Sequence, residues 1–220
     1  MYFSRSRANC VLENSPIDGV MKVYEISTLA KPSNSPFKVY AGLYADDKIW
    51  RFIVTPECEG FMGIPRKKTW KTQPFYIDKP LAPIPNFFHV SAGAFVCDEK
   101  ARELAAEPLE MSGEFLSIKV EGKKGKYWIY NCTNCINVVD SKKSKWTKLG
   151  PKPDDRMMER PAFYASRFGE ESIFKIPEDR ATLVYCAEFT GDWEDGEFKA
   201  VVEHSGLTGL KFKLVWTDED

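Results

Sequence analysis

The pair Cys132-Thr-Asn-Cys135 has the residue types and spacing in this chain that are most typical of metal or redox chemistry. A structural zinc site needs four ligands, usually from two such pairs, and a thioredoxin-like site needs the pair at a helix N-terminus. The residues that follow, INVVD, favour a strand instead. The other cysteines are isolated: Cys10, Cys58, Cys97 and Cys186. We therefore interpret Cys132 and Cys135 as partly buried structural thiols, and keep a thiol-based redox or metal-binding protein as an alternative.

His89 and His204 are the two histidines of the chain. A Cys–His or Ser–His–Asp enzyme would have to use one of them, and neither has a second ligand at metal-binding spacing. The sequence leaves open whether Cys97 and His89 meet in space. It contains no glycine-rich phosphate-binding loop and no HExxH motif. We predict a protein that is not an enzyme and needs no cofactor or metal.

Charge is unevenly distributed along the chain, although the net charge is −1. Residues 116 to 150 hold eight lysines and two acids, whereas residues 181 to 220 hold nine acids and three lysines. A tryptophan among carboxylates suits protein recognition, as an apolar anchor with electrostatic steering, although a solvated capped loop is the alternative. The candidate partner-binding residues are therefore Asp192, Trp193, Glu194, Asp195 and Glu197. The short basic stretch RKKTWK (66–71) is weak evidence for nucleic acid in a near-neutral chain, so we expect none.

The composition is that of an ordinary globular protein, with 43% hydrophobic and 29% charged residues over 220 positions. The first residues contain early arginines and no apolar run, so we expect no signal peptide and a cytoplasmic location with reduced thiols. Pro80 to Cys97 lacks formal charge, but its prolines and polar groups would be unsatisfied in lipid. We expect no membrane association.

Hydrophobic alternation predicts strands in the first third of the chain. They are a strand over Met21–Ile26 and a hairpin formed by Phe37–Leu43 and Lys48–Val54. Residues 55 to 86 are rich in proline and glycine, which favours loops or short strands. We place a soft domain boundary here, between a β-rich part (1–85) and an α+β domain (86–220).

The next stretch begins with a helix that Asp98 caps and Pro108 ends. A hairpin follows, with Glu114–Glu121 and Lys126–Asn131 as its strands. Residues 141 to 161 are polar and are expected to form a linker.

The last third is predicted to hold three short strands, a helix and a final strand. The strands are Phe163–Phe168, Ser172–Ile176 and Ala181–Cys186. The helix is capped by Asp195 and stopped by Gly206. In the final strand, Leu210–Trp216, the apolar residues Leu210, Phe212, Leu214 and Trp216 alternate with Lys211 and Lys213. The fold class is therefore α+β, with mostly antiparallel short strands and two or three short helices packed on them. The segments AFVCDEKARELAAEPLEMSGEFLSI and TLVYCAEFTGDWEDGEFKAVVEHSGLTGLKFKL share a strand, acidic cap, helix, glycine, strand pattern, which indicates either a duplication or a common β-α-β arrangement.

Five short pieces occur in order along the second part of the chain: AFVCDEKARELA (94–105), KYWIYN (126–131), VVDSKKSKW (138–146), SIFKI (172–176) and SGLTGLKF (205–212). Together they resemble the pattern of a bacterial family of immunity proteins from polymorphic toxin systems, long catalogued as a domain of unknown function. The resemblance covers about residues 86 to 216, and its specificity comes from the ordered set because each piece is short.

The resemblance implies a cytoplasmic, non-enzymatic protein that binds and neutralises a cognate protein toxin. A structural module of a secretion system is a further alternative, and the oligomeric state stays open. The resemblance carries no binding residues over to this chain, so the candidates around Trp193 rest on composition alone.

Overall fold

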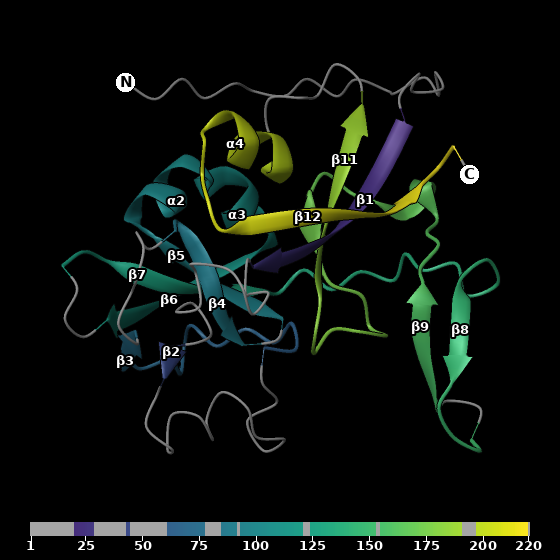
Figure 1. The fold of residues 1–220 in the computed structure, drawn as a ribbon, viewed down its shortest axis with the longest axis horizontal. Helices are drawn as coiled ribbons and strands as arrows, with labels where there is room; N and C mark the ends of the chain where they lie inside the picture. The colour runs from purple at the N-terminus through teal and green to yellow at the C-terminus, as the bar shows by residue number, and fades with distance from the viewer. Residues whose placement is uncertain are drawn as a thin grey trace, which may run out of the picture.

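The computed structural model describes residues 20–28, 43–44, 61–77, 85–91, 93–120, 124–152, 155–190 and 197–219. Within these ranges the protein is α+β, as the sequence predicted, with short and mostly antiparallel strands and short helices (Figure 1). The strands form a six-stranded sheet, a four-stranded sheet and a separate two-stranded hairpin. No helix among the described residues is long and apolar enough to cross a membrane.

The six-stranded sheet has the order β2-β3-β6-β7-β5-β4, and all of its pairs are antiparallel except β3 with β6. Its strands are β2 (Leu43–Tyr44), β3 (Gln73–Ile77), β4 (Phe87–Ser91), β5 (Ala94–Asp98), β6 (Gly113–Val120) and β7 (Tyr127–Cys132). The predicted hairpin of β6 and β7 is confirmed. Its side chains alternate between two cores, with Trp128 and Tyr130 on one face of β7 and Ile129 on the other.

The four-stranded sheet has the order β10-β11-β1-β12. Its strands are β1 (Val20–Thr28), β10 (Ile173–Phe174), β11 (Val184–Thr190) and β12 (Leu210–Thr217). A register shift opposite Val23 and Tyr24 interrupts the pairing of β1 with β12. Because one extra residue reverses the alternation, Leu214 is exposed rather than buried as its place in the predicted pattern suggested.

Helices α2 (Glu99–Leu104) and α3 (Ala106–Ser112) connect β5 to β6. Asp98 is the N-cap of α2, as predicted, and its carboxylate accepts a hydrogen bond from the Ala101 N–H at 2.8 Å. The expectation that Pro108 ends the helix is wrong, because Pro108 lies in the first turn of α3. A first-turn residue has no intrahelical N–H partner, so proline is tolerated there.

Helix α4 (Phe198–His204) connects β11 to β12. Its N-cap is Glu197, so the predicted cap at Asp195 is wrong. Gly206 ends the helix with a φ of 61°, and the N–H of Leu207 bonds to the Val202 carbonyl at 3.0 Å, as the glycine stop predicted.

The two segments with the same sequence pattern adopt the same topology. β5 and β6 both pair antiparallel with β7, so they run parallel with β7 between them. β11 and β12 have the same relation to β1. Each unit is therefore a β-α-β connection split by an antiparallel strand, and in the second unit that strand comes from the N-terminal part of the chain.

Three hydrophobic clusters hold these layers together. The central core lies where both sheets and helices α2, α3 and α4 meet, and includes Phe87, Phe95, Ala101, Leu109, Tyr130, Cys186, Phe198 and Val202. On the other face of the larger sheet, Phe61 and Trp70 from the preceding segment cover Val96, Leu116 and Ile129. On the other face of the smaller sheet, Val138, Val139 and Phe163 cover Met21, Val23 and Tyr185.

The polar segment at 141–161 is not a linker. It forms the antiparallel hairpin of β8 (Lys145–Lys148) and β9 (Arg156–Arg160), which projects from the rest of the protein (Figure 1). The next predicted strand, Phe163–Phe168, is also wrong: Phe163 makes one isolated bridge to Val139, and a 3-10 helix, η2 (Ala165–Arg167), follows.

Strands from both sides of the predicted domain boundary near residue 85 share the sheets, because β3 pairs with β6 and β1 pairs with β11 and β12. The division into two parts stays a prediction about folding units. The predicted hairpin at 37–54 lies outside the described residues apart from β2, which pairs with β3.

Candidate partner-binding surfaces

The acidic turn predicted to bind a partner lies mostly outside the described residues, which include neither Asp192, Trp193, Glu194 nor Asp195. Glu197 is described and is buried. Its carboxylate accepts a hydrogen bond from the Phe189 N–H at 2.7 Å. Glu197 therefore links the start of α4 to β11. Binding of a partner by the acidic turn stays a prediction.

The CxxC pair places one thiol inside the protein and one at its surface. Cys132 ends β7 in the central core, with its Sγ 3.7 Å from the Asn134 carbonyl oxygen, whereas Cys135 is exposed. Burial raises the pKa of the Cys132 thiol to about 12 and also raises the pKa of Cys135. Both thiols are therefore protonated near neutral pH, whereas redox catalysis and metal binding use the thiolate. The described residues contain no group of three or more histidine, cysteine or carboxylate side chains that could hold a metal ion.

The two histidines lie on different elements of the fold. His89 lies in β4, opposite Phe95, and His204 is the exposed last residue of α4. Cys97 is buried in β5, and burial raises the pKa of its thiol well above the ordinary value.

A buried lysine beside the CxxC segment was not predicted from the sequence. Lys175 is fully buried, and its Nζ donates hydrogen bonds to the carbonyl oxygens of Phe61 and, at 3.0 Å, Arg180. Its backbone pairs with the segment that contains Cys135. Burial lowers the pKa of Lys175 to about 8. The sequence offers one signal for this burial. Lys175 lies inside the apolar piece SIFKI, whose residues are expected to be buried.

The basic stretch at 66–71 is a loop bound to the larger sheet. The Glu114 carboxylate accepts hydrogen bonds from the N–H groups of Arg66, at 2.5 Å, and Lys67, at 3.0 Å. The Trp70 indole N–H bonds to the Ser117 carbonyl at 2.8 Å. The tryptophan of this stretch is therefore used to attach the loop, while Lys68 and Lys71 are exposed.

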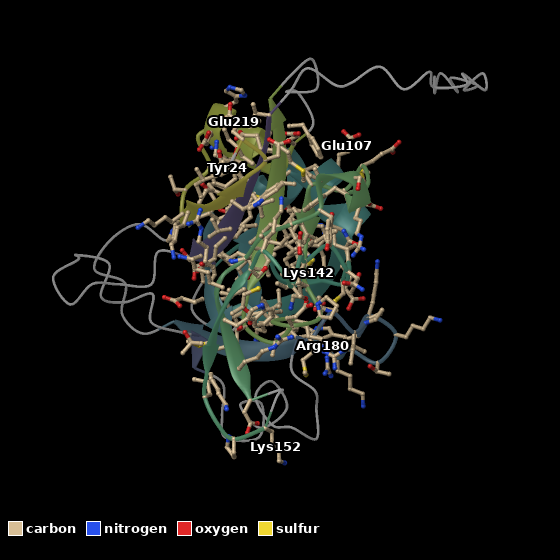
Figure 2. The ribbon with its side chains drawn as sticks, turned by 90° about the vertical axis from the view of Figure 1, so that its right-hand side faces the viewer. Tyr24, Glu107, Lys142, Lys152, Arg180 and Glu219 are labelled. Atoms are coloured by element: carbon tan, nitrogen blue, oxygen red, sulfur yellow. The ribbon has the colours of Figure 1, made fainter. Side chains whose placement is uncertain are left out.

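Helices α2 and α3 carry exposed apolar side chains among carboxylates. Leu104 and Met111 are 47% and 48% exposed. The exposed acids beside them are Glu103, Glu107 and Glu110, and Figure 2 shows Glu107 at the outer edge of the protein. We call this surface the α2–α3 face.

The β8–β9 hairpin carries exposed apolar side chains among basic ones. Leu149 and Met157 are 66% and 53% exposed. The surrounding exposed basic residues are Lys142, Lys143, Lys145, Lys148, Lys152, Arg156 and Arg160. Figure 2 shows Lys152 at the end of the hairpin farthest from the sheets.

Comparisons with known proteins assign no family to this chain. No protein-family model matches the chain, and no curated protein matches it.

Proposed function

We propose that this protein is a non-enzymatic immunity protein, which binds a cognate bacterial toxin in the cytoplasm and neutralises it. The observation that carries the proposal is the combination, on two separate elements, of exposed large apolar side chains with an excess of one sign of charge. The α2–α3 face combines Leu104 and Met111 with acids, and the hairpin combines Leu149 and Met157 with bases. Apolar anchors give binding energy, and the surrounding charges give specificity and fast association.

Two of the reactive side chains among the described residues, Lys175 and Cys132, serve the fold, which supports a binding role. Lys175 donates to two backbone carbonyls, and Cys132 is a protonated thiol in the central core. The same holds for pieces of the sequence that resemble the immunity family: Asp98 caps α2 and Gly206 ends α4. These pieces build a scaffold, which leaves the exposed side chains to determine the partner.

Neutralisation on this proposal is steric. An interface of standard size covers about 800 Å² on each partner, which is large enough to close the active site of a small toxin domain. Such an interface needs a desolvated apolar centre with a polar rim, and each of the two surfaces has both kinds of side chain.

The proposal is tested by expressing the protein together with the C-terminal domain of a toxin encoded immediately upstream of its gene. We expect cell growth to be restored, and the two purified proteins to form a stable complex by calorimetry. The matched control is a toxin domain of unrelated sequence, which the protein should neither bind nor neutralise. Failure to rescue growth together with absence of a complex would overturn the proposal. Replacing Trp193 by Ala in the same assay tests the predicted acidic turn.

A further inference from the structure

We infer that the β8–β9 hairpin is the element that docks on an acidic surface of the protein partner. Met157 and Leu149 are its apolar contacts, and its lysines and arginines form the charged surround. The inference rests on the proposed function, because the partner it assigns to the hairpin is the toxin.

The base of the hairpin is fixed to the protein by buried hydrogen bonds. The Ser144 hydroxyl donates to the Asp140 carbonyl at 2.8 Å and accepts from the Ala162 N–H at 2.9 Å. Asp140 also donates its N–H to the Ala162 carbonyl at 2.8 Å. Trp146 and Met158, which lie opposite each other, pack partly against the cluster on the outer face of the smaller sheet. A hairpin held in this way keeps its orientation, so binding costs less conformational entropy than ordering a loop.

Backbone hydrogen bonds also join the described residues toward the far end of the hairpin. The Asp155 carbonyl accepts hydrogen bonds from the N–H groups of Leu149, at 2.7 Å, and Gly150, at 3.2 Å. The Asp155 carboxylate accepts from the Lys152 N–H at 3.2 Å. These bonds join the ends of the two strands and leave the side chain of Leu149 exposed. Leu149 and Met157 are exposed on the same hairpin, and this suits a surface that a partner covers.

The charge of the hairpin indicates the chemistry of that partner. From Ser141 to Arg160 the sequence holds seven lysines and arginines and three acids. Arg156 and Lys148 lie opposite each other, so two positive charges are neighbours on one face. Like charges directly opposite each other destabilise a strand pair, and a carboxylate surface would relieve that repulsion. Electrostatic complementarity therefore favours an acidic partner.

A protein surface fits the hairpin better than a nucleic acid does. The guanidinium of Arg156 covers the Trp146 ring at 4.0 Å, and the indole N–H donates to the Ser141 carbonyl at 3.2 Å. The ring is thus occupied and is not offered to a base for stacking, which is the main sequence-tolerant contact with single strands. The exposed side chains of Met157 and Leu149 instead match an apolar centre in a protein interface.

The test is calorimetry with the C-terminal domain of the upstream-encoded toxin and two triple variants of the full chain. The hairpin variant is Lys148→Glu, Lys152→Glu, Met157→Ser. The control variant is Lys68→Glu, Lys71→Glu, Leu214→Ser, which makes the same charge changes and removes an exposed apolar side chain outside both candidate surfaces. We expect the hairpin variant to weaken binding by about 100-fold or more, and the control by less than about threefold. Added salt should weaken binding of the wild-type protein more than that of the hairpin variant.

Each other result overturns the inference in a distinguishable way. Equal affinity of the wild type and the hairpin variant would leave the proposed function standing and remove the hairpin from the interface. Absence of binding by the wild-type protein would overturn the proposed function and the inference with it. Titration with a fluorescent 20-base-pair DNA and light scattering across concentrations test the other occupants. Tight DNA binding, or self-association, that only the hairpin variant loses would assign the hairpin to those partners instead. Near-ultraviolet circular dichroism confirms that both variants are folded.

Discussion

A methyl group added to Gly209 would lie 1.8 Å from the carbonyl oxygen of Phe87. The Phe87 N–H also bonds to the Thr208 carbonyl at 2.9 Å. The start of β4 in the larger sheet is therefore in direct backbone contact with the turn between α4 and β12 of the smaller sheet. This contact requires glycine at position 209, because only glycine allows the two backbones to approach so closely.

Replacing Gly209 by Ala should destabilise the protein severely. The new methyl group meets backbone atoms, which cannot rotate away, and the φ of 106° is one that other residues rarely adopt. We expect the free energy of unfolding to fall by about 3 kcal/mol or more. Urea unfolding followed by tryptophan fluorescence measures this loss.

The Gly206→Ala variant is the matched control for the clash. Gly206 also has a positive φ, of 61°, but nothing lies within 4 Å of its added methyl group. We expect a loss of about 1 kcal/mol from backbone strain alone. Equal losses at both positions would show that the close approach of Gly209 to Phe87 does not exist in solution.

Lys175 should make the stability depend on pH in the alkaline range. Burial lowers its pKa from 10.5 to about 8 in the folded protein. Between these two values the unfolded chain binds more protons than the folded one, so the contribution of Lys175 to stability rises with pH. The expected rise is up to about 3 kcal/mol, since each pKa unit corresponds to about 1.4 kcal/mol.

The Lys175→Met variant isolates this effect, because the other groups titrate in both proteins. The difference between the unfolding free energies of the wild type and the variant should grow in favour of the wild type from pH 8 to pH 10.5. Below pH 8 the difference should not change with pH. A difference that is flat across the whole range would show that Lys175 is solvated in the folded protein.

The sequence predicted the elements in which local patterns and burial agree. β1, β6, β7 and α2 occur where local patterns or capping residues placed them, because both faces of these strands and one face of α2 contact a core. Gly206 ended α4 as expected because its positive φ is a local requirement. The pairing of β1 between β11 and β12 could not be predicted, because it joins residues more than 150 positions apart in the chain.

The wrong predictions have physical causes. β8 and β9 carry charged residues on both sides of each strand, so they lack the period-two pattern that marks a half-buried strand. Lys175 has an ordinary surface residue type, and its burial follows from carbonyl groups that come from Phe61 and Arg180. The two candidate binding surfaces were not predicted, because the exposure of Met157 and Leu104 depends on the folded structure. The composition indicated the turn around Trp193 instead.

The thiols of the CxxC pair should be poorly reactive. With a pKa of about 12, less than about one in ten thousand Cys132 side chains is a thiolate at pH 7.5. We expect iodoacetamide to leave Cys132 unmodified in the folded protein, and to modify exposed Cys135 more slowly than it modifies a free cysteine, because the pKa of Cys135 is raised. Peptide mass spectrometry after timed labelling measures both. Rapid labelling of either thiol would favour the alternative of a thiol-based redox or metal-binding protein.

The base of the β8–β9 hairpin should depend on the buried hydroxyl of Ser144. Replacement by Ala removes the acceptor of the Ala162 N–H and leaves that donor unpaired in the protein interior. An unsatisfied buried group costs about 1 to 3 kcal/mol, and amide hydrogen exchange in β8 and β9 should become faster because the hairpin is less firmly attached. The control is Thr147→Ala, since Thr147 makes an exposed hydrogen bond to Glu159 at 3.1 Å and its loss should cost less than about 0.5 kcal/mol. If exchange in the hairpin is equally fast in the wild type and in Ser144→Ala, the hairpin is not held by its base, and a rigid docking element is the wrong description of it.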